Sequence, residues 1–266
     1  MSASDEKRIP DLQTVLAWEG EITNTRIREL LDIKMVQASR TLAGLLEYVG
    51  DCWSRPHTNG PVQFHHSAIA DTRGSPDHYL LAINRLSKAG TNLDALGIYD
   101  ARIDLSLISQ KIFASIVQAI RRKEGLEICY RSMTHPKGQT RIVFPHAIVR
   151  APRRWHMRAW CTQRQEFRDF VLGRMLSATP LNVATPQSQE QDSDWNGLEE
   201  MVIIPHPDLS PDQQDMIAEE FFPGSRSLRL RIRKCLKLYV IQDLQLATDP
   251  ERDLPPQYQL CLVGAS

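Results

Sequence analysis

The chain has 266 residues, 42% of them hydrophobic, which is enough for two or three small domains that each bury a modest core. Its 32 Lys and Arg balance its 32 Asp and Glu, which excludes a uniformly polycationic nucleic-acid coat, so any anion site must come from local clusters of basic residues. Five scattered cysteines without a CxxC pair argue against a zinc site or a disulfide framework, and the absence of an apolar signal core or membrane-length run predicts a cytoplasmic protein.

Residues 1–70 are predicted to form a small helical domain. Apolar residues repeat at helical spacing in three successive stretches between residues 9 and 49, and Thr23 or Asn24 is placed to cap the second helix. Two short helices joined by a tight turn and preceded by a third are typical of a helix-turn-helix. A Pro/Asn/Gly turn at 59–61 between two short extended runs fits a wing.

The third helix is where such a unit would contact DNA bases, because Gln and Arg form bidentate hydrogen bonds with adenine and guanine edges. Basic residues on the preceding helix and in the expected wing are placed to contact phosphates. An ordinary three-helix bundle with solvated polar faces is the alternative, and nearby acidic residues weaken a purely electrostatic case. The expected base contacts are Gln37, Ser39, Arg40 and Thr41, and the expected phosphate contacts are Arg26, Arg28, Arg55 and His57.

Residues 71–123 are predicted to be a helical connector. Loop-forming residues surround one short helix over 78–86, and isoleucines at a spacing of four predict a second helix within 106–125. Packing is the favoured role for that helix, so we assign it no chemistry.

From Leu126 the hydrophobic period changes to two, and residues 124–185 are predicted to form a small, strongly bent sheet or barrel of short strands. In the strand "RWHMRAWC", His156, Arg158 and Trp160 alternate with a second set of residues that is mostly apolar. One face of this strand is therefore expected in the core, and the other is expected to offer cations and an aromatic ring.

Arginine is concentrated in this sheet: residues 141–174 contain eight arginines and two acidic residues. Guanidinium groups match phosphate in bidentate geometry, a serine hydroxyl adds a donor, and Trp or Tyr can stack on a base. The pattern indicates a phosphate or nucleotide site. The alternative is an arginine-rich face that is solvated or pairs with acids from elsewhere in the chain.

A polar linker over 184–197 precedes the last predicted segment, residues 196–266. This segment is expected to hold a capped helix that begins near Pro211, a strand with alternating Leu/Ile and Arg, a further helix and a final short strand. The cationic strand face could contact DNA or a ligand, and a solvated face is the alternative.

The stretches "CYRSM", "PHAIV", "RWHMRAWC" and "FRDFVLGRM" resemble the successive strands of a WYL domain, the Sm-like β-barrel of bacterial ligand-responsive transcription factors. The tripeptide that names the family is Trp155-His156-Met157 here. The pattern "WHxRAWC" and the C-terminal "IIPHPDLSPDQQDMIAEEF" are similar to the subgroup that controls phage-defence islands, the BrxR and CapW regulators. The resemblance covers nearly the whole chain. It implies an α+β fold with an N-terminal winged helix-turn-helix, a central Sm-like β-barrel and a C-terminal α/β extension that helps to form a homodimer.

The resemblance also implies a ligand pocket, lined in this family by a serine after a strand tyrosine, a histidine on the next strand and arginines on later strands. These side chains are expected to converge on one face of the barrel and to bind a phosphate-bearing effector such as a nucleotide or a short nucleic acid. The expected ligand-binding residues are Tyr130, Ser132, His146, His156, Arg158, Arg168 and Arg174.

The sequence therefore predicts a homodimeric, ligand-responsive transcriptional regulator without catalytic activity, cofactor or metal. It is expected to repress a phage-defence operon by binding an inverted-repeat operator in double-stranded DNA. One alternative is a nucleic-acid-processing enzyme that uses the arginine-rich sheet as its substrate cradle, but the sequence lacks a phosphate-binding loop, a paired-acid metal motif and a nucleophile elbow. A second alternative is an interaction module that does not bind DNA.

Overall fold

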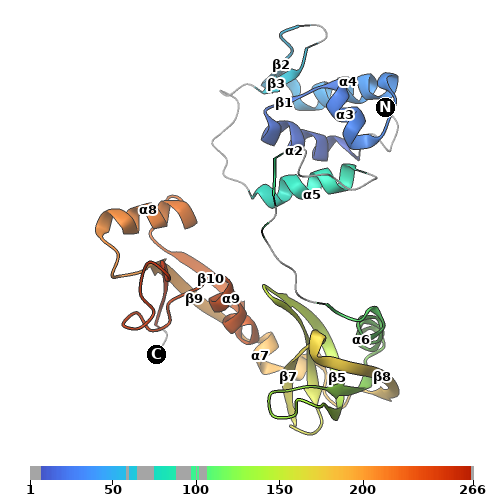
Figure 1. Ribbon diagram of the computed structural model, residues 1–266, viewed down its shortest axis with the longest axis vertical. Coiled ribbons are helices and arrows are strands. Elements are labelled where there is room, and N and C mark those ends of the chain that lie inside the picture. Colours follow the sequence, from blue (N-terminus) through green and yellow to red (C-terminus); the bar gives the residue numbers. More distant parts are fainter. Residues whose placement is uncertain are drawn as a thin grey trace. The chain divides into compact units, whose positions relative to one another are not determined.

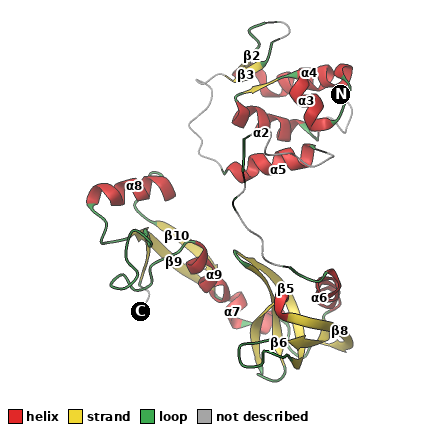
Figure 2. Ribbon diagram, viewed as in Figure 1, coloured by secondary structure: helices red, strands yellow, loops and turns green. Residues whose placement is uncertain are grey.

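The computed structural model describes residues 7–57, 60–64, 75–87, 97–99, 101 and 107–264. The chain divides into two compact units, residues 1–101 and 102–266, and each is described by itself. Figure 2 shows that the first unit is mainly helical and that the second combines sheets with helices, so the fold is α+β.

The N-terminal unit is a helical bundle with a small antiparallel sheet in which β3 lies between β1 and β2. Its apolar core joins the four α-helices that the structure describes in this unit, and Leu12, Ile27, Leu45 and Ile83 are fully buried there. In this unit α5 packs along α2 (Figure 1), and Arg85 of α5 pairs with Asp11 of α2 at 2.6 Å. The elements are α2 (Ile9–Glu19), β1 (Glu21–Ile22), α3 (Asn24–Leu31), α4 (Met35–Val49), β2 (Trp53–Ser54), β3 (Val62–Phe64) and α5 (Pro76–Leu86).

The tight connection between α3 and α4 follows from local chemistry. Thr23 caps α3, since its Oγ1 accepts a hydrogen bond from the backbone N–H of Arg26 at 3.0 Å, which confirms the expected cap. The helix ends at Asp32 in the left-handed conformation (φ 51°), which turns the chain so that α4 begins three residues later. The expected turn at 59–61 lies partly outside the described residues, which resume at Gly60 before β3.

The second unit contains a five-stranded antiparallel sheet in the order β7-β6-β5-β4-β8. Helix α6 packs against one face through Ile112 and Ile116 (Figure 1). A register shift between Pro145 and Ala147 marks a bulge in the long strand β5, a feature that bends a sheet. The elements are α6 (Gln110–Arg122), β4 (Glu124–Tyr130), β5 (Gln139–Ala151), β6 (Arg154–Cys161), β7 (Glu166–Val171), the 3₁₀ turn η3 (Leu172–Arg174) and β8 (Met175–Ala184).

Strands β7 and β8 are the two edges of this sheet, so within residues 107–264 the sheet is open and not hydrogen-bonded into a closed barrel. Both faces of β6 are covered. Met157 and Ala159 lie in the core under α6, while His156 and Arg158, expected on an open cationic face, are also buried. Arg158 is covered by a buried carboxylate, Asp192, that the segment after β8 brings to this face, and His156 by the ring of Tyr239.

A second antiparallel sheet, in the order β10-β9-β11, forms the C-terminal part of this unit with a core that includes Met201, Ile203 and Ile217. Ser210 begins α8 with a capping box to Gln213. The expected capped helix, Arg-alternating strand, further helix and last strand are all confirmed. The elements are η4 (Gln189–Gln191), α7 (Ser193–Asn196), β9 (Leu198–Pro205), α8 (Pro211–Phe221), β10 (Leu228–Arg233), η5 (Lys234–Leu236), α9 (Lys237–Asp243) and β11 (Leu260–Val263).

Candidate functional site

A cavity of about 310 Å³ opens beside β7 of the five-stranded sheet, and we call it the basic cavity. Its wall is built by the end of β4 and the loop that follows, by β5, β6 and β7, by the turn into β8, and by α9 of the C-terminal part. The polar residues of its wall are Tyr130, Ser132, Thr134, Arg141, Arg164, Arg168, Arg174, His156, Asp169 and Tyr239.

Two of these side chains are buried and not fully satisfied. Arg141 is 7% exposed, and its Nε has no hydrogen-bond partner among the described residues. His156 is also 7% exposed, and its Nδ1 likewise has no partner there. Of the described carboxylates, none forms an ion pair with Arg141, Arg164 or Arg174. Because a buried polar group without a partner is costly, the cavity is complementary to an anionic ligand that accepts hydrogen bonds.

The wall also holds one carboxylate. Asp169 accepts a hydrogen bond from the hydroxyl of Tyr239 at 2.8 Å, and its other oxygen lies 3.4 Å from Nη1 of Arg158. Burial and the bond to Asp169 raise the pKa of Tyr239, so its hydroxyl stays protonated and acts as a donor. Burial lowers the pKa of His156, whose ring lies 4.7 Å from that of Tyr239. The imidazole is therefore neutral at neutral pH.

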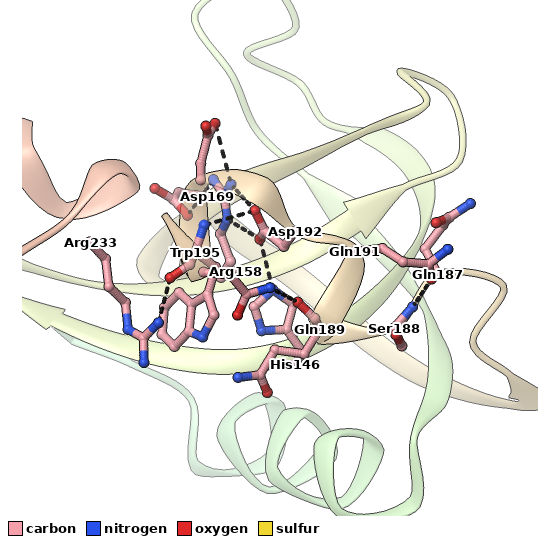
Figure 3. Close-up of polar contacts among 12 residues, drawn as sticks. His146, Arg158, Asp169, Gln187, Ser188, Gln189, Gln191, Asp192, Trp195 and Arg233 are labelled. Carbon is pink, nitrogen blue, oxygen red and sulfur yellow. Dashed lines mark hydrogen bonds and ion pairs between the residues drawn. The ribbon is translucent and has the colours of Figure 1, made fainter. Parts of the chain in front are cut away.

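Next to this cavity, a buried carboxylate organises a second polar cluster, which Figure 3 shows and which we call the Asp192 hub: Asp192, Arg158, His146 and Trp195. Asp192 is 1% exposed and accepts hydrogen bonds from Arg158 Nε at 2.7 Å and Nη2 at 2.8 Å. It also accepts from the backbone N–H of Trp195 at 3.1 Å, and the Nε2 of His146 lies 3.0 Å away. The carboxylate is thus saturated with partners from β5, β6 and α7.

The hub is charged at neutral pH. Burial by itself would raise the pKa of Asp192, but the hydrogen bonds from Arg158 and His146 outweigh it, and the pKa is lowered. Burial lowers the pKa of His146 in spite of its bond to Asp192. The guanidinium of Arg233 on β10 lies over the ring of Trp195 at 4.6 Å and donates to its backbone carbonyl (Figure 3). The hub therefore joins the five-stranded sheet to the C-terminal sheet.

The structure brings five of the seven expected ligand-binding residues to the basic cavity: Tyr130, Ser132, His156, Arg168 and Arg174. His146 and Arg158 lie at the Asp192 hub instead. Arg158 faces Asp169 across the β6–β7 pair while Arg168 lies opposite Ala159, so these two arginines are on opposite faces of the sheet. This corrects the expectation of one shared face, and the reason is the register of β6 and β7, which places the two arginines on opposite faces. On its own face Arg158 pairs with Asp192 and does not line the cavity.

Sequence reasoning missed Arg141, Arg164, Asp169, Tyr239 and Asp192 as members of these sites. Arg141 and Arg164 are among the eight arginines of residues 141–174, but residue type alone does not show which of the eight face a cavity. Asp192 carries a local signal, because an Asp before a short helix is a typical N-cap, and it does cap α7. The burial of Asp192 could not be predicted from the neighbouring sequence, because its partners on β5 and β6 are 46 and 34 residues away.

In the N-terminal unit, the expected DNA-contacting residues separate by exposure. Thr41 is 2% exposed and belongs to the core side of α4, which removes it as a base contact. Arg26 is half-buried and donates to Glu19 from Nε at 3.0 Å and from Nη2 at 2.6 Å, so it is engaged within the bundle. Tyr79 donates to the same carboxylate at 2.8 Å, and burial with that bond raises its pKa to about 12. The exposed members are Arg28, Gln37, Ser39, Arg40, Arg55 and His57.

Among the described residues, no group of three His, Cys, Asp or Glu side chains is arranged to hold a metal ion. Of the helices that the structure describes, none is both long and apolar enough to cross a bilayer.

Comparison with known proteins identifies two families in the second unit. Residues 111–180 match the WYL domain, and residues 198–266 match the BrxR transcriptional regulator C-terminal dimerization domain. Three curated relatives named DNA-binding transcriptional repressor CapW align with 97% of this chain. They come from Pseudomonas aeruginosa (29% identical, 88% of the relative covered), Escherichia coli strain KTE188 (29%, 88%) and Stenotrophomonas maltophilia (27%, 89%).

The matched segments coincide with the parts of the chain that build the site. The WYL match spans α6 and most of the five-stranded sheet, including nearly all of the basic cavity, and the dimerization match begins at β9 and includes Tyr239. The chain is therefore a WYL-domain protein with a BrxR-type C-terminal dimerization domain, and it is a homologue of proteins named DNA-binding transcriptional repressor CapW.

Proposed function

We propose that this protein is a homodimeric, DNA-binding transcriptional repressor of a phage-defence operon, and that its WYL domain senses a phosphate-bearing effector. The observation that carries the proposal is a basic cavity with a buried arginine, Arg141, whose Nε has no hydrogen-bond partner among the described residues. The cavity occurs in a chain that aligns over 97% of its length with proteins named DNA-binding transcriptional repressor CapW. The dimerization domain supports the homodimer, because an inverted-repeat operator requires two copies of the reading element.

The N-terminal unit supplies the DNA-binding element of this proposal. The described element order, helix, strand, two helices and a strand pair, supports a winged helix-turn-helix in which α4 would be the recognition helix. Gln37 and Arg40 lie on the exposed side of α4, where they would meet base edges in the major groove. Exposed Arg28, Arg55 and His57 would contact phosphates.

The basic cavity supplies the sensing element. Arg141, Arg164 and Arg174 offer guanidinium forks, and Ser132 adds a hydroxyl, which suits the phosphate of a nucleotide or of a short nucleic acid. The Arg168–Glu166 pair is solvent-exposed at 2.8 Å, so a phosphate can compete with Glu166 at little cost. An effector changes DNA affinity only by binding one dimer arrangement more tightly than another, and for a repressor we expect it to favour the arrangement that releases the operator.

An operator–reporter assay combined with gel shifts tests both elements. The DNA upstream of the protein's own gene should shift at protein concentrations that leave a scrambled fragment of equal length unbound, and phage infection should derepress a reporter under that DNA. The Arg174→Gln variant should repress as well as the parent but fail to respond to infection. Equal binding to both fragments would contradict the repressor assignment, and normal derepression of the variant would contradict the sensing cavity.

A further inference from the structure

Two polar contacts of different character link the WYL sheet to the C-terminal dimerization domain. The Asp192 hub is the first: its carboxylate is buried, ionised and saturated by Arg158, His146 and the N–H of Trp195, and Arg233 of β10 holds Trp195 from the other side (Figure 3). The second is Tyr239 of α9, which donates to Asp169 on β7.

Only the second contact faces open space. Tyr239 lies in the wall of the basic cavity and also in the wall of a larger cavity of about 850 Å³ between the β5–β6 hairpin and the dimerization domain. Asp169 belongs to the wall of the basic cavity as well, whereas Asp192 and Arg158 belong to the wall of neither cavity. A ligand can therefore reach the Tyr239–Asp169 bond directly, but not the hub.

We propose that Tyr239 couples the basic cavity to the dimerization domain. When a phosphate binds among the arginines, the Tyr239 hydroxyl donates its hydrogen bond to a phosphate oxygen instead of to Asp169, while the contacts of the Asp192 hub stay unchanged. This inference rests on the proposed function, because it requires that the cavity bind an anion. It assigns to Tyr239 a positioning role that links ligand binding to the arrangement of the dimer.

The chemistry of the three groups favours the exchange. A tyrosine hydroxyl has one proton to donate, so it cannot serve Asp169 and a phosphate oxygen fully at the same time. The incoming anion also raises the electrostatic cost of keeping Asp169 directed at the cavity, because like charges repel in a partly desolvated site. Asp169 is not left uncompensated after the exchange, since Nη1 of Arg158 lies 3.4 Å from its other oxygen.

The test compares the full-length parent with Tyr239→Phe, which removes the hydroxyl and keeps the ring against His156. Inorganic pyrophosphate is the probe, its binding is measured by calorimetry, and hydrogen exchange of the α9 amides is measured by mass spectrometry. We expect pyrophosphate to speed α9 exchange in the parent by roughly five-fold, the factor that corresponds to the loss of one hydrogen bond. The variant should show that faster exchange without pyrophosphate and no further change when pyrophosphate binds.

Tyr258→Phe is the matched control, because Tyr258 lines the larger cavity but not the basic one, and it should behave as the parent. Pyrophosphate binding to the parent without an α9 response, or an α9 response of equal size in Tyr239→Phe, would overturn the coupling and leave the sensing cavity standing. Failure of pyrophosphate to bind the parent, or binding that Arg174→Gln does not weaken, would overturn the cavity of the proposed function and the coupling with it.

Discussion

Arg158 is held between two carboxylates in an almost solvent-free part of the WYL domain. It donates to Asp192 through two nitrogens at 2.7 and 2.8 Å and lies 3.4 Å from Asp169. Removing one partner of such a buried pair leaves the other charge without compensation, which costs more than the pair itself contributes. Arg158 is thus a structural residue, although its neighbours on β6 and β7 line the basic cavity.

The Arg158→Ala variant should lose roughly 3–5 kcal/mol of unfolding free energy, because Asp192 stays buried without its bidentate partner. Urea unfolding followed by circular dichroism measures this loss. Arg168→Ala on the adjacent strand is the control. Its side chain is about half exposed, and its one ion pair among the described residues is with exposed Glu166, so its loss should stay under about 1 kcal/mol. Similar losses in both variants would show that the hub does not stabilise the domain.

The two arginines also show what sequence can predict about a site. Their type and clustering indicated anion binding, and five of the seven expected residues do line the cavity. Alternation along β6 placed His156 and Arg158 on the same face, as observed, but could not reveal that Asp192 covers that face. Whether a charged side chain is buried in an ion pair or lines a cavity depends on which residues from distant parts of the sequence contact it. The periodicity of one strand does not contain that information.

Helix α4 is the element on which DNA recognition depends in the proposed function. Val36, Arg40, Ala43 and Glu47 recur every three or four residues and are all exposed, while the opposite side of the helix, including Leu45, lies in the core. This stripe is free of the packing that holds Thr41. The first turns of the stripe, where Arg40 lies, are the part of a recognition helix that meets bases.

Replacing Arg40 with Ala should weaken operator binding by roughly 1–3 kcal/mol while changing binding to scrambled DNA much less, as expected for loss of a bidentate base contact. Fluorescence anisotropy at matched salt measures both affinities. Arg122→Ala, on the exposed side of α6 in the other unit, is the control for the change in net charge. If Arg40→Ala weakened binding to both DNAs equally, Arg40 would contact phosphate and not a base.

At the level of elements, hydrophobic periodicity predicted most of the helices and strands of both units, but not β8 or β9, the middle strand of the C-terminal sheet. The segment 184–197 was expected to be a linker, because its Gln, Ser and Asp content is typical of a solvated one. In the structure it forms η4 and α7 and delivers Asp192 to the sheet. The two helices of the expected connector, residues 71–123, belong to different units: α5 packs on α2 in the first, and α6 packs on the sheet in the second.

For the whole molecule, zero formal net charge means that the DNA affinity of the proposed function cannot come from bulk attraction and must come from a defined surface repeated in the proposed dimer. The proposed recognition helix, α4, lies in the first unit, while the basic cavity and the dimerization domain lie in the second. In the proposed scheme an effector in the cavity acts through the arrangement of the two copies, which would set the separation of the two α4 helices.

A symmetric dimer of this kind should protect two half-sites about one helical turn apart, roughly 34–36 Å, or a multiple of that distance. Inserting about five base pairs between the half-sites turns one of them by roughly half a helical turn, so the two α4 helices can no longer enter both major grooves. We expect footprinting to show one protected half-site and a large loss of affinity. An operator in which five central base pairs are substituted, with its length unchanged, should bind nearly as well as the original. Light scattering that found only monomer at micromolar concentration, with and without DNA, would contradict this arrangement.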